Sequence, residues 1–329
     1  MLGCSKYEAF DGFTQGTTYH IIYERKGLFS TSPVKMKGEV DSILAHFDLS
    51  LSAYEPNSII SRINRNDPQV VPDSDFLIVF NKSLEVFEDS EGAFDITVGP
   101  LVNAWGFGPG RKKDMDSMIV DSLLQYVGMN KVKLINNKIV KKIPEIKLDV
   151  NAIAQGYSVD VVSNFFKEKR INNFLVEIGG ELRTNGTKKN GALWKVGVDK
   201  PYDNNYIPGQ NLQIILKLKD CSLATSGNYR KFFEKDGVKY SHSINPKTGY
   251  PVKDSLLSAT IIAKDCITAD AYATTCMVMG LEKSKVFISE RDDLEAYLIY
   301  SSEFNDSFVI WQSNNFEKLI WKEENTQAF

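Results

Sequence analysis

Three side chains toward the C-terminal end of the sequence have the chemical character needed to act on a phosphate. Two residues separate His242 from the stretch NPKTG at 245–249, whose proline and glycine are typical of a tight turn. Asp270 and Thr274 are four residues apart, so on a helix their side chains share one face. Carboxylate and hydroxyl oxygens suit Mg²⁺, which takes substrate phosphates as further ligands, and an imidazole can act as a general base. Together these residues indicate metal-assisted chemistry on a phosphate.

Each of these features also has a purely structural explanation. An isolated Asp-x-x-x-Thr pair is most often a solvated helix face, and an acid near a helix start, as Asp270 would be, also favours the helix dipole. His242 could equally be a hydrogen-bonded surface histidine at the rim of the turn. His20 falls in a predicted strand and His46 in a predicted amphipathic helix, so we expect both to be structural. The three residues by themselves leave these alternatives open.

The elements that must position these residues alternate irregularly along the chain. Stretches rich in β-branched and aromatic residues predict strands at 17–25, 174–178, 182–186, 194–198, 212–218, 222–225, 238–243, 296–300 and 307–311, and a hairpin over 131–140. Apolar residues at helical spacing predict helices over 34–48, 76–88, 152–169, 268–279 and 281–289, with a short one ending at 64. Because many strands are adjacent in sequence, we expect a mixed α+β fold with largely antiparallel sheets and packed helices.

Composition limits the classes of function that the chain can serve. With 329 residues, of which 43% are hydrophobic and 25% charged, the chain can bury one large core or two smaller ones. Its formal net charge of −3, without a long basic run, argues against nucleic-acid binding. The sequence holds no apolar stretch long enough to cross a bilayer as a helix.

The four cysteines fall into two groups. Three lack a Cys or His partner at metal-binding spacing, so we expect reduced core thiols and no zinc site at Cys221, Cys266 and Cys276. Cys4, in LGCS, follows a small residue as in the lipidation site of a bacterial lipoprotein; the alternative is an ordinary residue in an irregular N-terminus. We therefore expect residues 1–12 to be a flexible tether with a lipid anchor at Cys4, and residues 13–329 to form the functional domain.

Eight segments, taken in chain order, closely resemble the ApbE family of FAD:protein FMN transferases, and they span nearly the whole sequence. They are QGTT (15–18), LSAYEPNSIISRIN (51–64), GAFDITVGPLVNAWGFG (92–108), LDVNAIAQGYSVD (148–160), VEIGGE (176–181), ATSG (224–227), YSHSINPKTG (240–249) and TADAYATT (268–275). Several are rich in glycine and small hydroxyl residues, which let the backbone approach a ligand.

The resemblance implies an ApbE-like fold with a T-fold-like core and an FAD cleft between lobes. Members of the family transfer the FMN half of FAD to a threonine hydroxyl of an acceptor protein, require Mg²⁺ and release AMP. The acceptor is typically a respiratory redox subunit that carries a Ser/Thr-Gly-Ala-Thr type motif. By the same resemblance, the protein would act on the periplasmic side of a bacterial membrane.

Site residues follow from the matching motif positions. The implied Mg²⁺ ligands are the side chains of Asp270 and Thr274 and the backbone carbonyl of Ala152, and His242 would be the base or orienting group for the threonine hydroxyl. The implied flavin and adenine contacts are Gln15, Tyr54, Ala93, Phe94, Asp95, Asp149, Gln155 and Ile244. The implied phosphate or isoalloxazine contacts are Thr225, Ser226 and Gly227.

Three positions depart from the pattern of the family. Gln15 stands where Met is common, Gln155 where Lys or Glu is common, and Asn245 where Asp is common. Since none of them is an implied metal ligand, we expect the chain to be active. Two alternatives remain: an FAD pyrophosphatase that forms FMN and AMP, and a non-catalytic FAD-binding lipoprotein.

Overall fold

An antiparallel sheet of eight strands organises the molecule. The computed structural model describes residues 6–25, 31–201, 209–228, 232–235, 238–241, 243–302 and 308–322. In spatial order the sheet consists of β1 (Lys6–Thr14), β2 (Thr17–Arg25), β5 (Phe174–Ile178), β6 (Glu181–Asn185), β9 (Ser222–Gly227), β12 (Leu256–Ala263), β13 (Glu295–Ser301) and β14 (Phe308–Gln312). Three two-stranded sheets accompany it: β3 (Val132–Ile135) with β4 (Lys138–Lys141), β7 (Trp194–Asp199) with β8 (Leu212–Leu218), and β10 (Phe232–Lys235) with β11 (Val238–Ser241).

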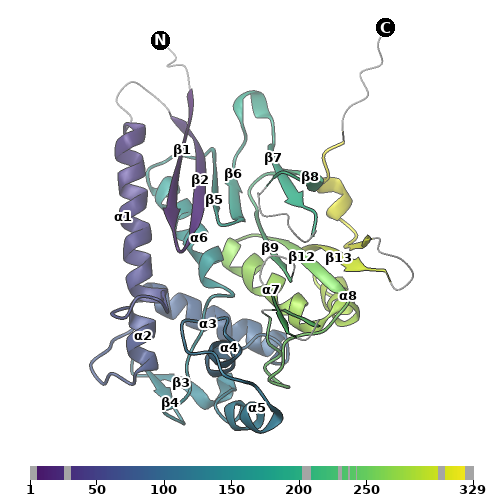
Figure 1. Cartoon of the computed structure of the whole chain (residues 1–329). Helices are drawn as coiled ribbons and strands as arrows, with labels where there is room; N and C mark the ends of the chain where they lie inside the picture. The colour runs from purple at the N-terminus through teal and green to yellow at the C-terminus, as the bar shows by residue number, and fades with distance from the viewer. Residues whose placement is uncertain are drawn as a thin grey trace.

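Helices cover the sheet and extend the molecule at one end. They are α1 (Pro33–Leu51), α2 (Ile59–Asn64), α3 (Ser74–Asp89), α4 (Gly99–Trp105), α5 (Ser117–Leu124), α6 (Ala154–Glu168), α7 (Cys266–Met279) and α8 (Leu281–Ser289). In Figure 1, α1 stands beside β1 and β2, while α6 and α7 lie against the sheet. The same view places α3, α4, α5 and the β3–β4 hairpin together at the lower end. The predicted α+β fold with antiparallel sheets is confirmed.

Two central features differ from the sequence-based expectation. Residues 6–12 are not a flexible tether: they belong to β1, which pairs with β2 from Lys6 through Thr14. The tether prediction is therefore wrong for this stretch, and Cys4 lies outside the described residues. Strand β12, together with α4 and α5, was not predicted, although β12 lies between β9 and β13 near the middle of the sheet.

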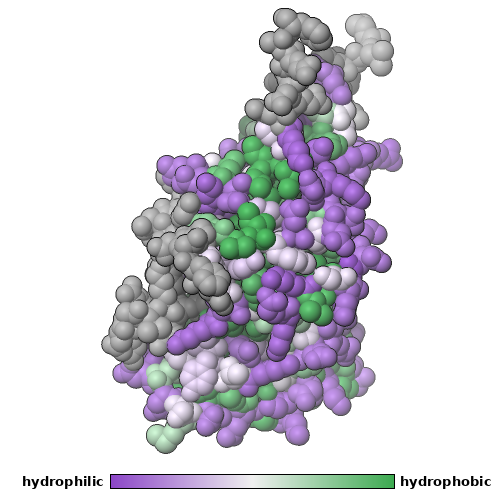
Figure 2. Space-filling model, turned by 90° about the vertical axis from the view of Figure 1, so that its right-hand side faces the viewer, coloured by the Kyte–Doolittle hydropathy of each residue, from purple (hydrophilic) through white to green (hydrophobic). Residues whose placement is uncertain are grey.

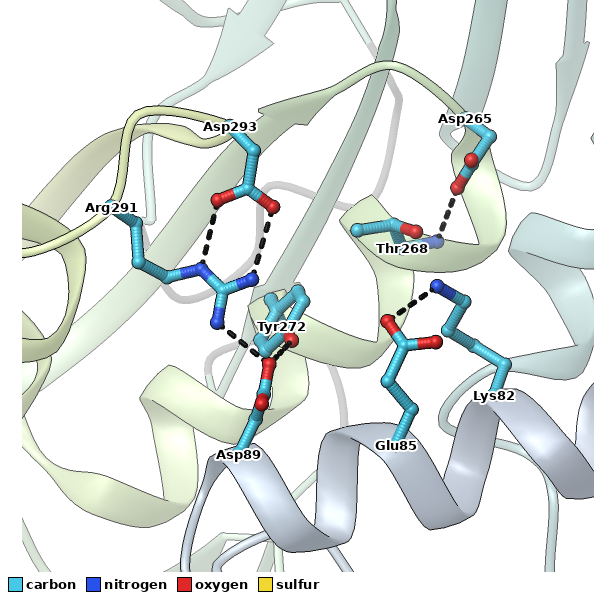
Figure 3. Close-up of polar contacts among 8 residues, drawn as sticks. All are labelled: Lys82, Glu85, Asp89, Asp265, Thr268, Tyr272, Arg291 and Asp293. Atoms are coloured by element: carbon cyan, nitrogen blue, oxygen red, sulfur yellow. Dashed lines mark hydrogen bonds and ion pairs between the residues drawn. The ribbon is translucent and has the colours of Figure 1, made fainter.

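A cluster of polar and aromatic side chains holds helix α7 against the end of α3 and the segment after α8, as Figure 3 shows. The Tyr272 hydroxyl donates to Asp89 Oδ2 at the end of α3, at 2.5 Å. Arg291 donates to the same oxygen at 2.7 Å and pairs with both carboxylate oxygens of Asp293 at 3.0 Å. Its guanidinium also stacks 4.7 Å from the centre of the Tyr272 ring, so α3, α7 and the segment after α8 are held together.

The surface is mixed in character. Figure 2, which turns the right-hand side of Figure 1 toward the viewer, shows a largely hydrophilic face with small hydrophobic groups between. Isolated groups of this kind are normal on protein surfaces. Within the described ranges, every helix is too short or too polar to cross a membrane.

Candidate active site

The site is built on the contact between α6 and α7. Asp270, in the second turn of α7, is only 5% exposed, and its Oδ2 accepts a hydrogen bond from the backbone N–H of Gly156 at 2.8 Å. The alternative of a solvated helix face therefore does not apply to Asp270. Burial raises the pKa of Asp270 from 3.8 to about 7, and the Gly156 N–H opposes that rise. A carboxylate held in this way gains from a nearby positive charge.

Thr274 lies one turn further along α7, where its side chain contacts strand β9. Its Oγ1 is 3.1 Å from Ser226 Oγ in β9. On the same strand, Thr225 Oγ1 is 2.9 Å from Thr260 Oγ1 in β12. The structure thus brings Asp270, Thr274 and the predicted contact Ser226 together where β9 passes α7, whereas the side chain of Thr225 lies on the opposite face of the sheet.

A second group of predicted contacts gathers at the start of α6. Gln155 Nε2 donates to Ile178 O at 3.0 Å and to Glu181 Oε2 at 2.6 Å, at the Gly179-Gly180 turn between β5 and β6. Gln15, in the turn between β1 and β2, lies 3.4 Å from Ser158 Oγ in α6. Its Nε2 is buried and has no hydrogen-bond partner among the described residues. Because a buried unpaired amide is unfavourable, this atom fits a ligand that accepts a hydrogen bond.

Tyr54 and Asp149 form a third group beside the turn that leads into α6. Tyr54 is 63% exposed, so its ring is open to a ligand. Burial raises the pKa of Asp149, and burial together with the negative charge of Asp149 raises the pKa of Tyr54. The backbone N–H of Asp149 donates to Ile96 O at 2.7 Å, which ties this turn to the loop that carries Ala93–Asp95.

Within that loop, the structure gives Asp95 an internal role. Its carboxylate accepts from Thr97 N at 2.7 Å, from Thr97 Oγ1 at 2.5 Å and from Met129 N at 3.1 Å. Phe94 is buried in the core, and Ala93 is half-buried. Because the side chains of Phe94 and Asp95 are buried, a ligand contact at this loop would involve its backbone.

The segment that follows His242 forms the predicted turn. Asn245 Oδ1 accepts from Lys247 N at 2.9 Å, and Gly249 N donates to Asn245 O at 2.8 Å. Ile244 is buried beside Leu101 and Trp105 rather than exposed to a ligand. His242 itself lies outside the described residues, so its role stays a prediction.

A hollow of about 230 Å³ lies next to this turn, between residues 245–254 and the C-terminal end of α7. Its lining includes Asn245 and Thr248 on one side and Met279 and Gly280 on the other. Asp270 and Thr274 do not line it. The FAD cleft between lobes that the resemblance implies therefore remains a prediction.

The oxygen atoms at the α6–α7 contact fit Mg²⁺. Across the described part of the chain, no three His, Cys, Asp or Glu side chains come together as a metal cluster. Asp270 and Thr274 instead offer two hard oxygens from one helix face, and no donor from the described residues reaches Asp270 Oδ1. Ala152 lies in the turn before α6, two residues ahead of the helix. Few protein ligands suffice for Mg²⁺ when phosphates and waters complete its coordination.

Sequence reasoning missed Gly156, whose N–H fixes Asp270 and whose lack of a side chain lets the helices meet. A Cβ on this residue would clash with the Cys266 carbonyl and lie 2.6 Å from Asp270 Cβ. A glycine inside a predicted helix is the signal that could have indicated a close approach. Which element approaches it is a property of the tertiary fold alone.

Known proteins resemble this chain over nearly its full length. An FAD:protein FMN transferase of Vibrio cholerae is 34% identical over 98% of this chain and 96% of its own length. One of Haemophilus influenzae is 33% identical over 97% of this chain and 93% of its own length. Among solved structures, the flavin transferase ApbE from Vibrio cholerae superposes with a TM-score of 0.85 at 32% identity, covering 96% of this chain and all of its own. The Pseudomonas stutzeri flavinyl transferase ApbE, apo form, also gives 0.85, at 31% identity, covering 96% of this chain and 97% of its own. The family model described as "ApbE family" matches residues 15–298, and with these likenesses it shows that the chain belongs to the ApbE family.

Proposed function

We propose that this protein is an FAD:protein FMN transferase that uses Mg²⁺ to move FMN from FAD to a threonine hydroxyl, with release of AMP. The observation that carries the proposal is the buried carboxylate of Asp270, aligned with Thr274 and facing the start of α6. Membership of a family whose relatives carry this name supports the same reaction.

In the proposed reaction, the threonine oxygen of the acceptor forms a bond to the FMN phosphorus, and the P–O bond to AMP breaks. The hydroxyl proton passes to a base, for which we propose His242. The metal, when bound by Asp270, Thr274 and the Ala152 carbonyl, supplies positive charge that stabilises the phosphates as negative charge moves to AMP. The role of this chain's residues in the proposed reaction is therefore to bind and orient the pyrophosphate.

The start of α6 favours a pyrophosphate for two reasons. Its first turn receives the carboxylate of Asp270 on the N–H of Gly156, so a cation held by Asp270 would bring a phosphate to this end of the helix. The unpaired Nε2 of Gln15 lies nearby, since Gln15 contacts Ser158 of the same helix. We propose that Gln15 donates to an oxygen or nitrogen of FAD once FAD is bound.

Mass spectrometry of an acceptor domain with a Ser/Thr-Gly-Ala-Thr type motif tests the main proposal. After incubation with FAD and Mg²⁺, the acceptor should gain the mass of FMN, and an acceptor with that threonine replaced by valine should not. No covalent flavin on the intact acceptor would reject the transferase. An acceptor-free reaction, assayed for FMN and AMP, measures the FAD pyrophosphatase activity separately.

We also propose that Cys4 carries a lipid that holds the protein on the periplasmic side of a bacterial membrane, close to a respiratory redox subunit. The support is the LGCS sequence, in which a cysteine follows a small residue as in the lipidation site of a bacterial lipoprotein. The full chain made in a bacterial host should enter the detergent phase on phase separation, and Cys4→Ser should not. Equal partition of both proteins into water would contradict the anchor.

A further inference from the structure

Helices α6 and α7 satisfy each other's first-turn N–H groups. Asp270 of α7 accepts from the N–H of Gly156 at 2.8 Å, near the start of α6. In return, Asp160 of α6 accepts from the N–H groups of Cys266 and Ile267, the first two residues of α7. The two contacts are one helical turn apart on each helix, because Gly156 to Asp160 and Cys266 to Asp270 both span four residues. The arrangement therefore sets how far one helix can slide along the other.

Asp160 has more hydrogen-bond and ion-pair partners than Asp270. It is 4% exposed, its Oδ2 accepts from Cys266 N at 2.9 Å and from Ile267 N at 2.8 Å, and its Oδ1 lies 3.0 Å from Cys266 N. Arg183 of β6 forms an ion pair with Oδ1 and is itself mostly buried. The pair thus connects the sheet, α6 and the start of α7 through charge-assisted hydrogen bonds, which are the stronger kind.

The slide between these helices matters because the proposed Mg²⁺ ligands come from both. Ala152 precedes α6 by two residues, whereas Asp270 and Thr274 belong to α7. Each residue of slide moves a helix by about 1.5 Å, and Mg²⁺ demands oxygens at about 2.0–2.1 Å in near-octahedral geometry. Half a residue of slip would be enough to separate the ligands.

We propose that Asp160, held by Arg183, is a positioning residue for the transfer reaction: it fixes the start of α7 on α6 and so places Asp270 and Thr274 for the metal. This inference rests on the proposed function for the identity of the metal site. Asp160 touches neither of the two α7 ligands directly, and acts through the backbone of Cys266 and Ile267.

Asp160→Asn keeps the shape of the side chain and removes its charge, and Asp265→Asn is the matched control. Asp265 caps the same end of α7 by accepting from Thr268 N at 3.1 Å, and its hydrogen bonds hold no part of α6. An effect that comes only from removing one negative charge at the α7 start should thus appear in both variants. Loss of the α6–α7 alignment should appear only in Asp160→Asn.

Mn²⁺ binding, followed by the EPR signal of the free ion with ADP present, gives a readout independent of turnover. We expect Asp160→Asn to raise the Mn²⁺ dissociation constant, and the Mg²⁺ concentration for half-maximal FMN transfer, at least tenfold. The affinity of Asp160→Asn for FAD in EDTA, measured by flavin fluorescence, should change less than twofold. Asp265→Asn should match wild type in its Mn²⁺ dissociation constant, its half-maximal Mg²⁺ concentration and its FAD affinity. If Asp160→Asn does not fold, Asp160→Asn/Arg183→Met removes both charges and is measured instead.

The inference is overturned if the Asp160 variant binds Mn²⁺ as wild type does, if both variants lose Mn²⁺ equally, or if wild type binds no Mn²⁺. Failure of the proposed function looks different. In that case wild type binds Mn²⁺, the Asp160 variant still differs from the Asp265 control, and the acceptor gains no FMN from either protein.

Discussion

Asp270→Asn should stabilise the metal-free protein while removing its activity. In wild type, burial raises the pKa of this carboxyl from 3.8 to about 7, so the unfolded chain releases the proton at lower pH than the folded protein. Folding stability therefore falls as pH rises from 3.8 to 7 and stays reduced above 7. At about 1.36 kcal/mol per pKa unit, the loss is roughly 2 kcal/mol at pH 5 and roughly 4 kcal/mol at pH 8.

Asparagine at position 270 avoids this loss of folding stability, because it carries no charge and its Oδ1 can still accept from the N–H of Gly156. Urea unfolding in EDTA should show the Asp270→Asn protein more stable than wild type by up to about 4 kcal/mol at pH 8, and by about half of that at pH 5. Addition of Mg²⁺ with ADP should stabilise wild type and leave the variant unchanged, since the variant offers an amide in place of a carboxylate.

Asp265→Asn is the control for the unfolding experiment, because Asn is as good an N-cap as Asp and the change should alter stability by only a few tenths of a kcal/mol. The reasoning fails if Asp270→Asn is less stable than wild type in EDTA, or if its advantage does not grow between pH 5 and pH 8. Either result would mean that the Asp270 carboxylate is well solvated or well compensated in the absence of a cation.

Two further substitutions test the packing around α7. Gly156→Ala should cost about 2 kcal/mol in urea unfolding, because its Cβ would clash with the Cys266 carbonyl, and it should lower FMN transfer as well. Gly38→Ala, in α1 with nothing within 4 Å, should instead gain about 1 kcal/mol; equal effects at the two sites would refute the close approach. Tyr272→Phe removes only the hydroxyl that donates to Asp89 and should cost about 2 kcal/mol in the same assay, and an unchanged midpoint would show that this hydrogen bond adds nothing.

Most elements could be predicted from local pattern, and the exceptions have physical reasons. Strand β12, LLSATIIA, is buried along almost its whole length, so it lacks the alternation that marks a half-buried strand. Strand β1 has the opposite difficulty: it is an edge strand that carries Glu8, Asp11 and Gly12, which are uncommon in strands. Its pairing with β2 stabilises it, and the residues of β1 alone do not predict that pairing.

The motifs predict the site residues, but they say nothing of the surroundings of these residues. Helix α7 carries Ala, Cys, Met and Val on all sides, which is typical of a fully buried helix, so the burial of Asp270 could have been inferred from the sequence. The backbone N–H groups that Asp270 and Asp160 accept from could not, because each lies more than 100 residues away along the chain. No local pattern carries information over that separation.

The mutual capping of α6 and α7 also sets when the site can exist during synthesis. Gly156 and Asp270 are 114 residues apart, so α6 leaves the ribosome well before its capping carboxylate is made. At about 5–20 residues per second, the delay is roughly 6 to 23 s. Throughout that interval, a nascent chain has the Gln15 and Gln155 segments but lacks the proposed metal ligands of α7. An unfinished protein can therefore not cleave FAD, and the ability to do so arrives with one of the last helices translated.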